Sequence, residues 1–214
     1  MMTDTRNSTK MDVAVDSPYH PFKTQKAKEA YLKLYDNRAQ KWPVASTTRM
    51  VNTSYGKTFV RISGLHDGKP LVLMHGGGGN SLQWMSNIES LSKQYKVFAI
   101  DTINDNGRSI PVKSISNADD YISWLDGVFD ALGFKEGINV VGLSYGGWIA
   151  SQYALKFRVR INYVSLSKVK PSSIHPVIPP IIFLTGLLSF ASFMAAFSVA
   201  LQCGPAQYTT NKVS

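Results

Sequence analysis

One short motif in the chain, Gly142-Leu143-Ser144-Tyr145-Gly146, has the spacing expected of a nucleophilic serine. It matches the pattern Gly-x-Ser-x-Gly, in which small residues flank the serine because larger side chains would collide with the neighbouring strand and helix. The motif follows the apolar run 138–141 and opens a predicted helix, which is the context that the pattern requires. We therefore expect Ser144 to be a catalytic nucleophile on a strained turn. The competing interpretation is a glycine-rich turn with an incidental serine.

A glycine-rich loop, His75-Gly76-Gly77-Gly78-Gly79, follows the apolar run 71–74. Four consecutive glycines cost backbone entropy, so we expect the loop to bring its backbone close to a ligand. The expected use is an oxyanion hole, formed by the N–H groups of Gly77 and Tyr145. A phosphate-binding loop is rejected, because Asn80-Ser81 follows where that pattern needs Gly-Lys-Ser or Gly-Lys-Thr. A dinucleotide-binding fingerprint is the weaker alternative.

Other polar residues are expected in loops at the same edge of the sheet, where ligands bind in open α/β folds. His75 and Asp101 each end a predicted strand, and Gly76 and Gly78 belong to the glycine-rich loop. We expect His75 to fix its loop by hydrogen bonding, with a role as general base as the alternative. We expect Asp101 to accept hydrogen bonds from loop N–H groups. These four residues are the predicted pocket loops.

The elements that position these residues alternate between strands and helices, which predicts a three-layer α/β fold with a mostly parallel sheet. Continuous apolar runs indicate strands that are buried on both faces. In the first helix, Ala27, Ala30, Tyr31, Leu34 and the aliphatic stem of Arg38 recur at helical spacing, which predicts an amphipathic helix. A hairpin turn is expected at Tyr55-Gly56. The predicted helices cover 24–41, 81–94, 117–132 and 148–157, and the predicted strands cover 48–52, 58–63, 71–74, 97–100, 138–141 and 161–166.

Three regions are expected along the chain: a flexible arm over 1–22, a hydrolase-like core over 23–170, and an apolar region over 171–214. The segment 181–201 is uncharged and long enough to cross a bilayer as one helix. We favour the start of a cap or lid for this region, with a membrane tail as the alternative. A cytoplasmic location is expected in the first case and membrane association in the second.

Composition narrows the function classes. The net charge is +9, yet no Asp or Glu follows Ser144, while six Lys and Arg residues do. Those six are too scattered, and too poor in interleaved aromatic residues, to predict nucleic-acid binding. The single cysteine, Cys203, excludes an internal disulfide and shows no metal-site spacing. The oligomeric state cannot be derived from these features.

The order of the glycine-rich loop, the segment 101–109 and the Ser144 motif resembles the α/β-hydrolase superfamily. Within it, the chain resembles carboxylesterase-like and proline-iminopeptidase-like serine hydrolases. The resemblance implies an eight-stranded, mostly parallel sheet, a cap after the sixth strand, no cofactor, and a small-molecule ester or amide substrate. It also implies a catalytic triad in the order Ser, Asp or Glu, His. Ser144 matches the nucleophile, and Gly77 and Tyr145 match the oxyanion donors.

The chain departs from the family at the triad. No acid follows Ser144, and the later histidine, His175, lies where the family begins its cap. Arg158-Val159-Arg160 stands where members usually show a Pro-Glu-Arg-like turn. We therefore expect a carboxyl-terminally truncated hydrolase that lacks its last strands and is impaired by about 10⁴- to 10⁶-fold. The alternative is a non-catalytic hydrolase-fold binding protein or a fragment, tethered to a membrane by 181–201.

Overall fold

The computed structural model describes residues 21–167. The chain divides into two units, Met1–Ile174 and His175–Ser214, and every described residue belongs to the first. The predicted apolar region 171–214 and nearly all of the predicted arm lie outside the described residues, so both stay predictions. Among the helices within 21–167, none has the length and apolar content needed to cross a membrane.

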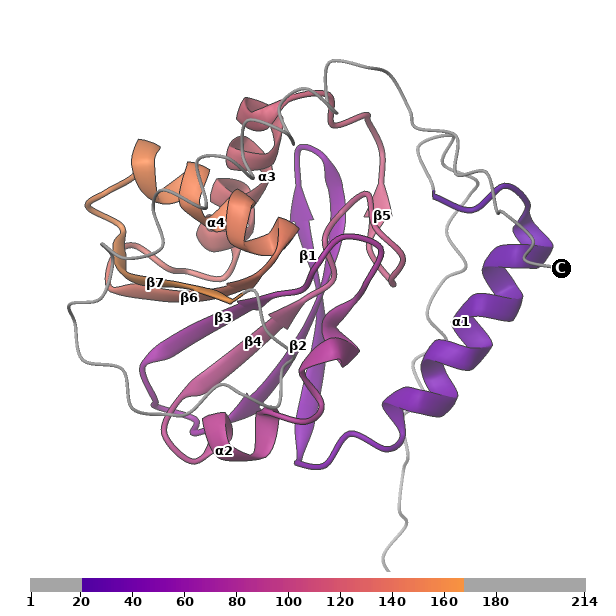
Figure 1. Cartoon of the computed structure of the whole chain (residues 1–214), viewed down its shortest axis with the longest axis horizontal. Helices are drawn as coiled ribbons and strands as arrows, with labels where there is room; N and C mark the ends of the chain where they lie inside the picture. Colours follow the sequence, from indigo (N-terminus) through magenta and orange to yellow (C-terminus); the bar gives the residue numbers. More distant parts are fainter. Residues whose placement is uncertain (1–20, 168–214) are drawn as a thin grey trace, which may run out of the picture. The chain divides into compact units, whose positions relative to one another are not determined.

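The described residues form one mixed sheet in the order β1-β2-β4-β3-β6-β7, with β5 paired to β2 (Figure 1). The centre and one side are parallel, since β3 pairs with β4 and β6, and β6 pairs with β7. The other side is antiparallel, where β2 pairs with β1, β4 and β5. The strands are β1 (Ser46–Thr53), β2 (Gly56–Gly64), β3 (Pro70–Met74), β4 (Lys96–Ile100), β5 (Ile110–Pro111), β6 (Ile138–Leu143) and β7 (Ile161–Ser167).

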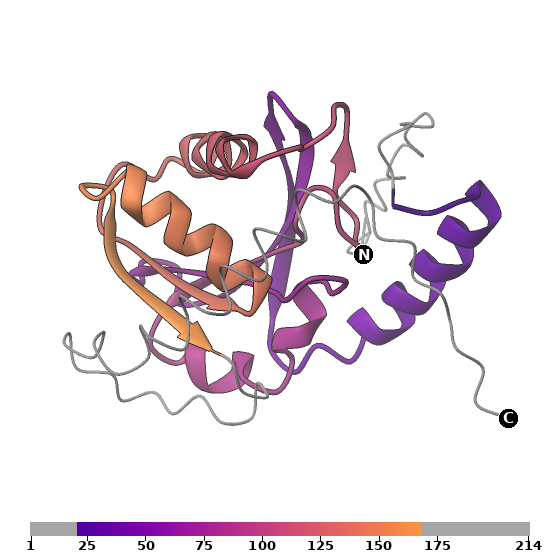
Figure 2. The same ribbon diagram turned by 45° about the horizontal axis from the view of Figure 1, so that its top comes forward.

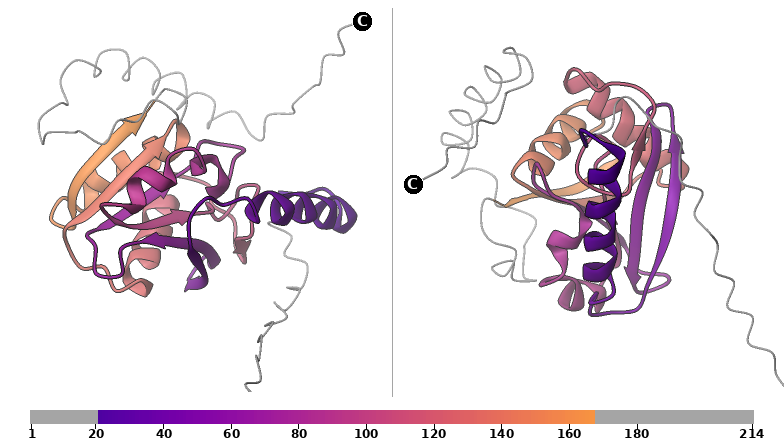
Figure 3. Two further views of the ribbon diagram at one scale, coloured as in Figure 1. Left: turned by 90° about the horizontal axis from the view of Figure 1, so that it is seen from below. Right: turned by 90° about the vertical axis from the view of Figure 1, so that its right-hand side faces the viewer.

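Helices cover both faces of this sheet, which confirms the predicted three-layer α/β fold (Figures 1 and 2). On one face, α3 (Ala118–Ala131) and α4 (Tyr145–Lys156) pack side by side, and α4 lies over β6 and β7. On the other face, the short helices η1 (Ser81–Trp84) and α2 (Ile88–Ser92) pack on β3, β4 and β2. The first helix, α1 (Gln25–Ala39), stands at the side of the sheet, apart from α3 and α4 (Figure 3).

Successive side chains of the central strands point to opposite faces of the sheet and are buried in the apolar layer on each face. Leu71 and Leu73 of β3 face a cluster that includes Trp84 of η1. Their neighbours Val72 and Met74 are fully buried beneath the opposite layer. Because β3 is apolar at consecutive positions, it can be covered on both faces, as its sequence predicts.

Two predicted helices differ from the observed ones. The predicted helix 81–94 is broken into η1 and α2 by a turn at 85–87, where the N–H of Asn87 bonds to the carbonyl oxygen of Trp84. Ser and Asn favour caps and turns over helix interiors, which explains the break. The predicted helix 148–157 corresponds to α4, which begins earlier, at Tyr145. The two-residue strand β5 was not predicted.

The predicted apolar face of α1 is wrong at most of its positions, although Tyr31 is half-buried and packs against the core. Leu34 is 69% exposed, and Ala27 and Ala30 are exposed as well. The residue of α1 that is buried is Tyr35, whose ring packs edge-on against Phe59. The helix α1 contacts the rest of the fold through a few polar and aromatic side chains. The contact of Tyr35, rather than the spacing of apolar residues, therefore determines which side of the helix is buried.

A buried hydrogen bond between β2 and α3 gives a test of this packing. The indole N–H of Trp124 donates to Oγ1 of Thr58 at 2.8 Å, and both residues are fully buried. Thr58→Val keeps the shape but leaves the indole without an acceptor, so we expect a loss of about 1–3 kcal/mol in unfolding free energy. Urea unfolding measures it, with Thr47→Val at an exposed site of β1 as the matched control. Equal losses in the two variants would contradict the assignment.

Candidate active site

Ser144 occupies a strained turn between β6 and α4. Its backbone angles are φ 51° and ψ −112°, and among residues 21–167 no other non-glycine residue has a positive φ. Such a conformation costs about 1–3 kcal/mol and persists only where the surrounding structure enforces it. The side chain of Ser144 is exposed at the amino-terminal end of α4. The predicted strained strand–turn–helix arrangement is therefore observed.

The glycines around Ser144 are required by close backbone approaches. A Cβ added at Gly142 would lie 2.4 Å from Cα of Gly147, which is closer than real Cβ atoms come to backbone. A Cβ added at Gly146 would lie 2.4 Å from the carbonyl oxygen of His75 and 2.6 Å from that of Met74. Gly146 thus lets the start of α4 rest directly on the end of β3, where the glycine-rich loop begins.

This contact brings the glycine-rich loop next to the residue that follows Ser144. A Cβ added at Gly77 would lie 3.6 Å from Cβ of Tyr145. The amide N–H groups of Gly76 and Gly79 are already bonded, to Oε1 of Gln83 and to the carbonyl oxygen of Gly76. Within residues 21–167, the N–H of Gly77 has no hydrogen-bond partner. The two predicted donor residues, Gly77 and Tyr145, therefore lie in contact beside Ser144.

His75 is held by both of its ring nitrogens. It is 1% exposed, and the N–H of Thr102 donates to Nε2 at 3.0 Å. Nε2 is then the unprotonated nitrogen, so Nδ1 carries the proton and donates to the carbonyl oxygen of Gly76 at 2.8 Å. A histidine with both nitrogens engaged links two loops and is poorly placed to accept a proton from serine. This is the loop-fixing geometry that the sequence predicts.

Asp101 is fully buried and ties three segments together. Its Oδ1 accepts the N–H of Ser81 at 2.7 Å, and its Oδ2 accepts the N–H of Arg108 at 2.8 Å. A Cβ at Gly107 would lie 2.6 Å from Oδ2, so only glycine lets the loop close on the carboxylate. Hydrogen bonds to loop N–H groups are what the sequence predicts for Asp101.

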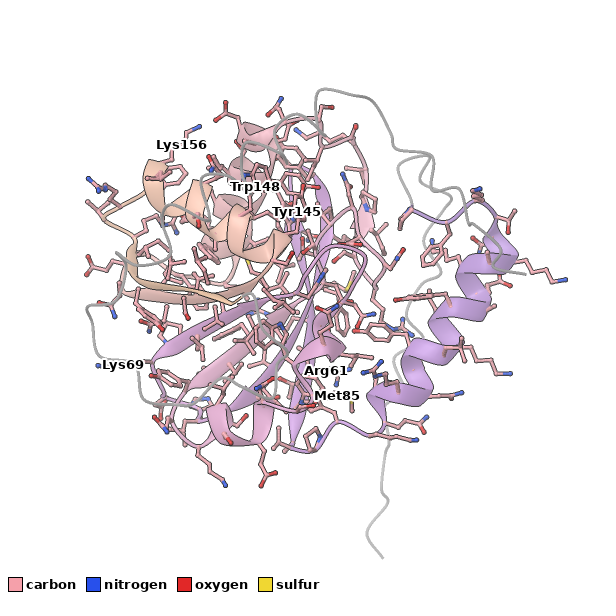
Figure 4. All side chains as sticks on the ribbon, in the orientation of Figure 1. Arg61, Lys69, Met85, Tyr145, Trp148 and Lys156 are labelled. Atoms are coloured by element: carbon pink, nitrogen blue, oxygen red, sulfur yellow. The ribbon has the colours of Figure 1, made fainter. Side chains whose placement is uncertain are left out.

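Two features near Ser144 were not singled out from the sequence. Asp105 accepts the N–H of Gly78, and its burial raises the pKa of the carboxyl above the ordinary value, an effect that the N–H donors partly offset. The rings of Tyr145 and Trp148, both labelled in Figure 4, stack with their centroids 5.2 Å apart. The ring of Tyr121, on α3, packs edge-on against both. Burial raises the pKa of Tyr121 and Tyr145, so both phenols keep their protons.

Little in the sequence marks either feature. Asp105 is one of several polar residues in the segment 101–109, and the aromatic contacts join two helices distant in the chain.

Within the described part of the chain, no three His, Cys, Asp or Glu side chains gather closely enough to hold a metal ion.

Replacement of Ser144 tests the backbone strain. Relative to alanine at position 144, glycine relieves about 1–3 kcal/mol of backbone strain. It also lowers the stability by about 0.5–1 kcal/mol, because glycine loses more conformational freedom on folding. We therefore expect Ser144→Gly to be more stable to urea than Ser144→Ala. At Ser151, within helical backbone of α4, the order should reverse, with glycine less stable by about 1 kcal/mol. The same order at both sites would argue against strain at Ser144.

Comparison with known proteins agrees with this geometry. A family model described as the alpha/beta hydrolase fold matches residues 69–189, more than half of the chain. An uncharacterized carboxylesterase of Bacillus subtilis (strain 168), nap, is 35% identical over 136 residues, which cover 64% of this chain and 45% of the relative. Carboxylesterase YbfK of the same organism is 35% identical over 132 residues, which cover 62% of this chain and 44% of the relative. The chain thus spans less than half the length of these curated relatives.

Solved structures give the same result. The crystal structure of naproxen esterase (carboxylesterase NP) from Bacillus subtilis has a TM-score of 0.62 at 34% identity, covering 67% of this chain and 50% of that one. The structure of carboxylesterase CesB (YbfK) from the same organism has a TM-score of 0.65 at 27% identity, covering 88% and 64%. With its strand order, its glycine-lined turn at Ser144 and the family match over 69–189, the chain belongs to the α/β-hydrolase fold family and is carboxylesterase-like.

Proposed function

We propose that this protein is a serine hydrolase that cleaves small-molecule esters, with Ser144 as its nucleophile. The observation that carries the proposal is the strained, exposed position of Ser144 at the start of α4, beside the glycine-rich loop. A binding protein would have no need for a serine in a conformation that costs about 1–3 kcal/mol. The similarity to bacterial carboxylesterases supports ester substrates over amides.

In the proposed reaction, Oγ of Ser144 attacks the ester carbonyl carbon and loses its proton to a base. The carbonyl oxygen becomes an anion, for which the N–H groups of Gly77 and Tyr145 are the proposed donors. The amino-terminal end of α4 adds the positive end of its dipole at the same place. The alcohol leaves with a proton, and water then releases the acid from the acyl-serine.

The described residues offer no free histidine as the base, so low activity of the 214-residue chain is part of the proposal. Among the described residues, His75 has both nitrogens engaged, and His66 is an exposed side chain bonded to Asp67. His175 lies outside the described residues. No acid follows Ser144 to orient a later histidine. A serine without its triad partners reacts about 10⁴- to 10⁶-fold more slowly, with the oxyanion donors and substrate binding left to act.

We also propose that residues 171–214 are the start of a cap and that residues 23–170 form the hydrolase core. The family match continues to residue 189 and thus into the apolar segment 181–201. This overlap supports a cap and weighs against a separate membrane tail.

The proposal is tested by labelling the full chain with a fluorophosphonate, which bonds covalently to activated serines. We expect slow labelling that is confined to Ser144, abolished in Ser144→Ala and kept in Ser151→Ala. Ser151 is the matched control, because it lies on the same helix with its hydroxyl bonded to the carbonyl oxygen of Gly147. Mass spectrometry of the labelled peptide and release of p-nitrophenol from a short-chain ester measure the two halves of the claim. A folded chain that shows neither reaction would overturn it in favour of a binding role.

A further inference from the structure

We propose that Asp105 is a positioning residue, which fixes the glycine-rich loop so that the N–H of Gly77 faces the oxygen of the reacting ester. This inference rests on the proposed function, since it assigns a role in the same site. Asp105 touches the loop and not the nucleophile, so its effect is exerted through the backbone.

The loop around Gly78 is held by hydrogen bonds. Oδ2 of Asp105 accepts the N–H of Gly78 at 3.0 Å, and Nδ2 of Asn106 donates to the carbonyl oxygen of Gly78 at 3.4 Å. Two consecutive residues of one loop thus bind the peptide groups on both sides of Gly78. Gly78 has a φ of +72°, and a Cβ added there would meet no atom within 4 Å. The N–H of Gly78 belongs to the peptide that follows Gly77, so the bond to Asp105 restrains the chain on the carboxyl side of Gly77. The preceding peptide, which carries the N–H of Gly77, is held at the carbonyl oxygen of Gly76 by Nδ1 of His75 and the N–H of Gly79, so Asp105 completes the set of bonds that orients Gly77.

Asp105 and Asn106, which hold Gly78, are themselves held by further hydrogen bonds. The N–H of Asp105 bonds to the carbonyl oxygen of Thr102, and Oδ1 of Asp105 accepts the N–H of Asn106 at 3.0 Å. The hydroxyl of Tyr31, on α1, donates to the carbonyl oxygen of Asn106 at 3.1 Å and accepts from Nδ2 of Asn80 at 2.8 Å. The side chain of Asp105 is 17% exposed, whereas Gly78 is exposed, so their hydrogen bond lies at the surface of the site.

Geometry and charge act in opposite directions at Asp105. The carboxylate binds the loop, but it also brings a negative charge to the residue next to Gly77, the proposed donor to the oxygen that becomes negative. Asparagine keeps one oxygen that can accept the N–H of Gly78, and it loses the charge and the second acceptor, which binds the N–H of Asn106. Alanine removes both the acceptor and the charge. The two substitutions therefore separate positioning from electrostatics and from a merely structural contribution.

The experiment uses the full chain in three variants: Asp105→Asn, Asp105→Ala and, as a control on an exposed carboxylate, Asp67→Ala. The structural readout is the amide resonances of Gly77 and Gly78 together with their hydrogen-exchange rates. We expect Asp105→Ala to shift both resonances and to speed the exchange of Gly78 by at least about tenfold, the factor that corresponds to about 1.4 kcal/mol of a hydrogen bond. Asp105→Asn and Asp67→Ala should stay close to wild type.

The chemical readout is the rate of fluorophosphonate labelling at Ser144, whose phosphoryl oxygen would bind the same N–H groups. We expect a loss of about tenfold in Asp105→Ala and rescue in Asp105→Asn. Unchanged Gly77 and Gly78 amides in a folded Asp105→Ala variant would overturn the inference, as would altered amides with an unaltered labelling rate. A wild-type chain that does not label at all would contradict the proposed function, while the amide spectra would still decide whether Asp105 sets the loop. If Asp105→Ala does not fold, Asn106→Ala takes its place, because it removes the donor to the carbonyl oxygen of Gly78; unshifted Gly77 and Gly78 amides in that variant would overturn the inference.

Discussion

The contact between Gly146 and the end of β3 is the constraint on which the site depends. At Gly146 the first turn of α4 lies against the carbonyl oxygens of Met74 and His75, closer than any side chain would allow. That contact fixes the height of Ser144 above the sheet and, at the same time, the point at which the glycine-rich loop leaves β3. Ser144 and the glycine-rich loop are therefore positioned by one backbone approach, and an error in it would move both together.

Hydrogen bonds of buried polar side chains connect the loops around this contact. His75 links the end of β3 to Thr102 after β4, and Asp101 links that loop to Ser81 and Arg108. These groups are buried, so each unmade hydrogen bond would cost about 1–3 kcal/mol. The loops at this edge of the sheet are therefore joined to one another. The side chains of His75 and Asp101 accept hydrogen bonds from loop N–H groups that no helix or strand pairs.

The parts that the sequence predicts are those with local causes. The glycines flanking Ser144 and the apolar run of β3 reflect steric limits and burial that act on neighbouring residues, so strand, turn and helix could be placed from their order. The buried face of α1, the break at 85–87 and the hydrogen bond between Asp105 and Gly78 depend on partners distant in the chain. Leu34 obeys the helical period yet is exposed, because Tyr35 finds a hydroxyl and an aromatic partner in the fold. Asp105 and its neighbour Asn106 both bond to Gly78, a distant partner that no local sequence pattern predicts.

The way in which α1 is attached affects how the molecule opens. This helix buries one residue, whereas α3 buries five, and it is fastened mainly by the hydroxyls of Tyr31 and Tyr35 and by the ion pair of Asp36 with Arg108. Elements with little buried apolar area detach at lower free energy than the global unfolding transition. Fluctuations of α1 away from the sheet would release Asn80 and Asn106 together, so the order of the loops beside Ser144 is thermodynamically linked to the folding of the first helix.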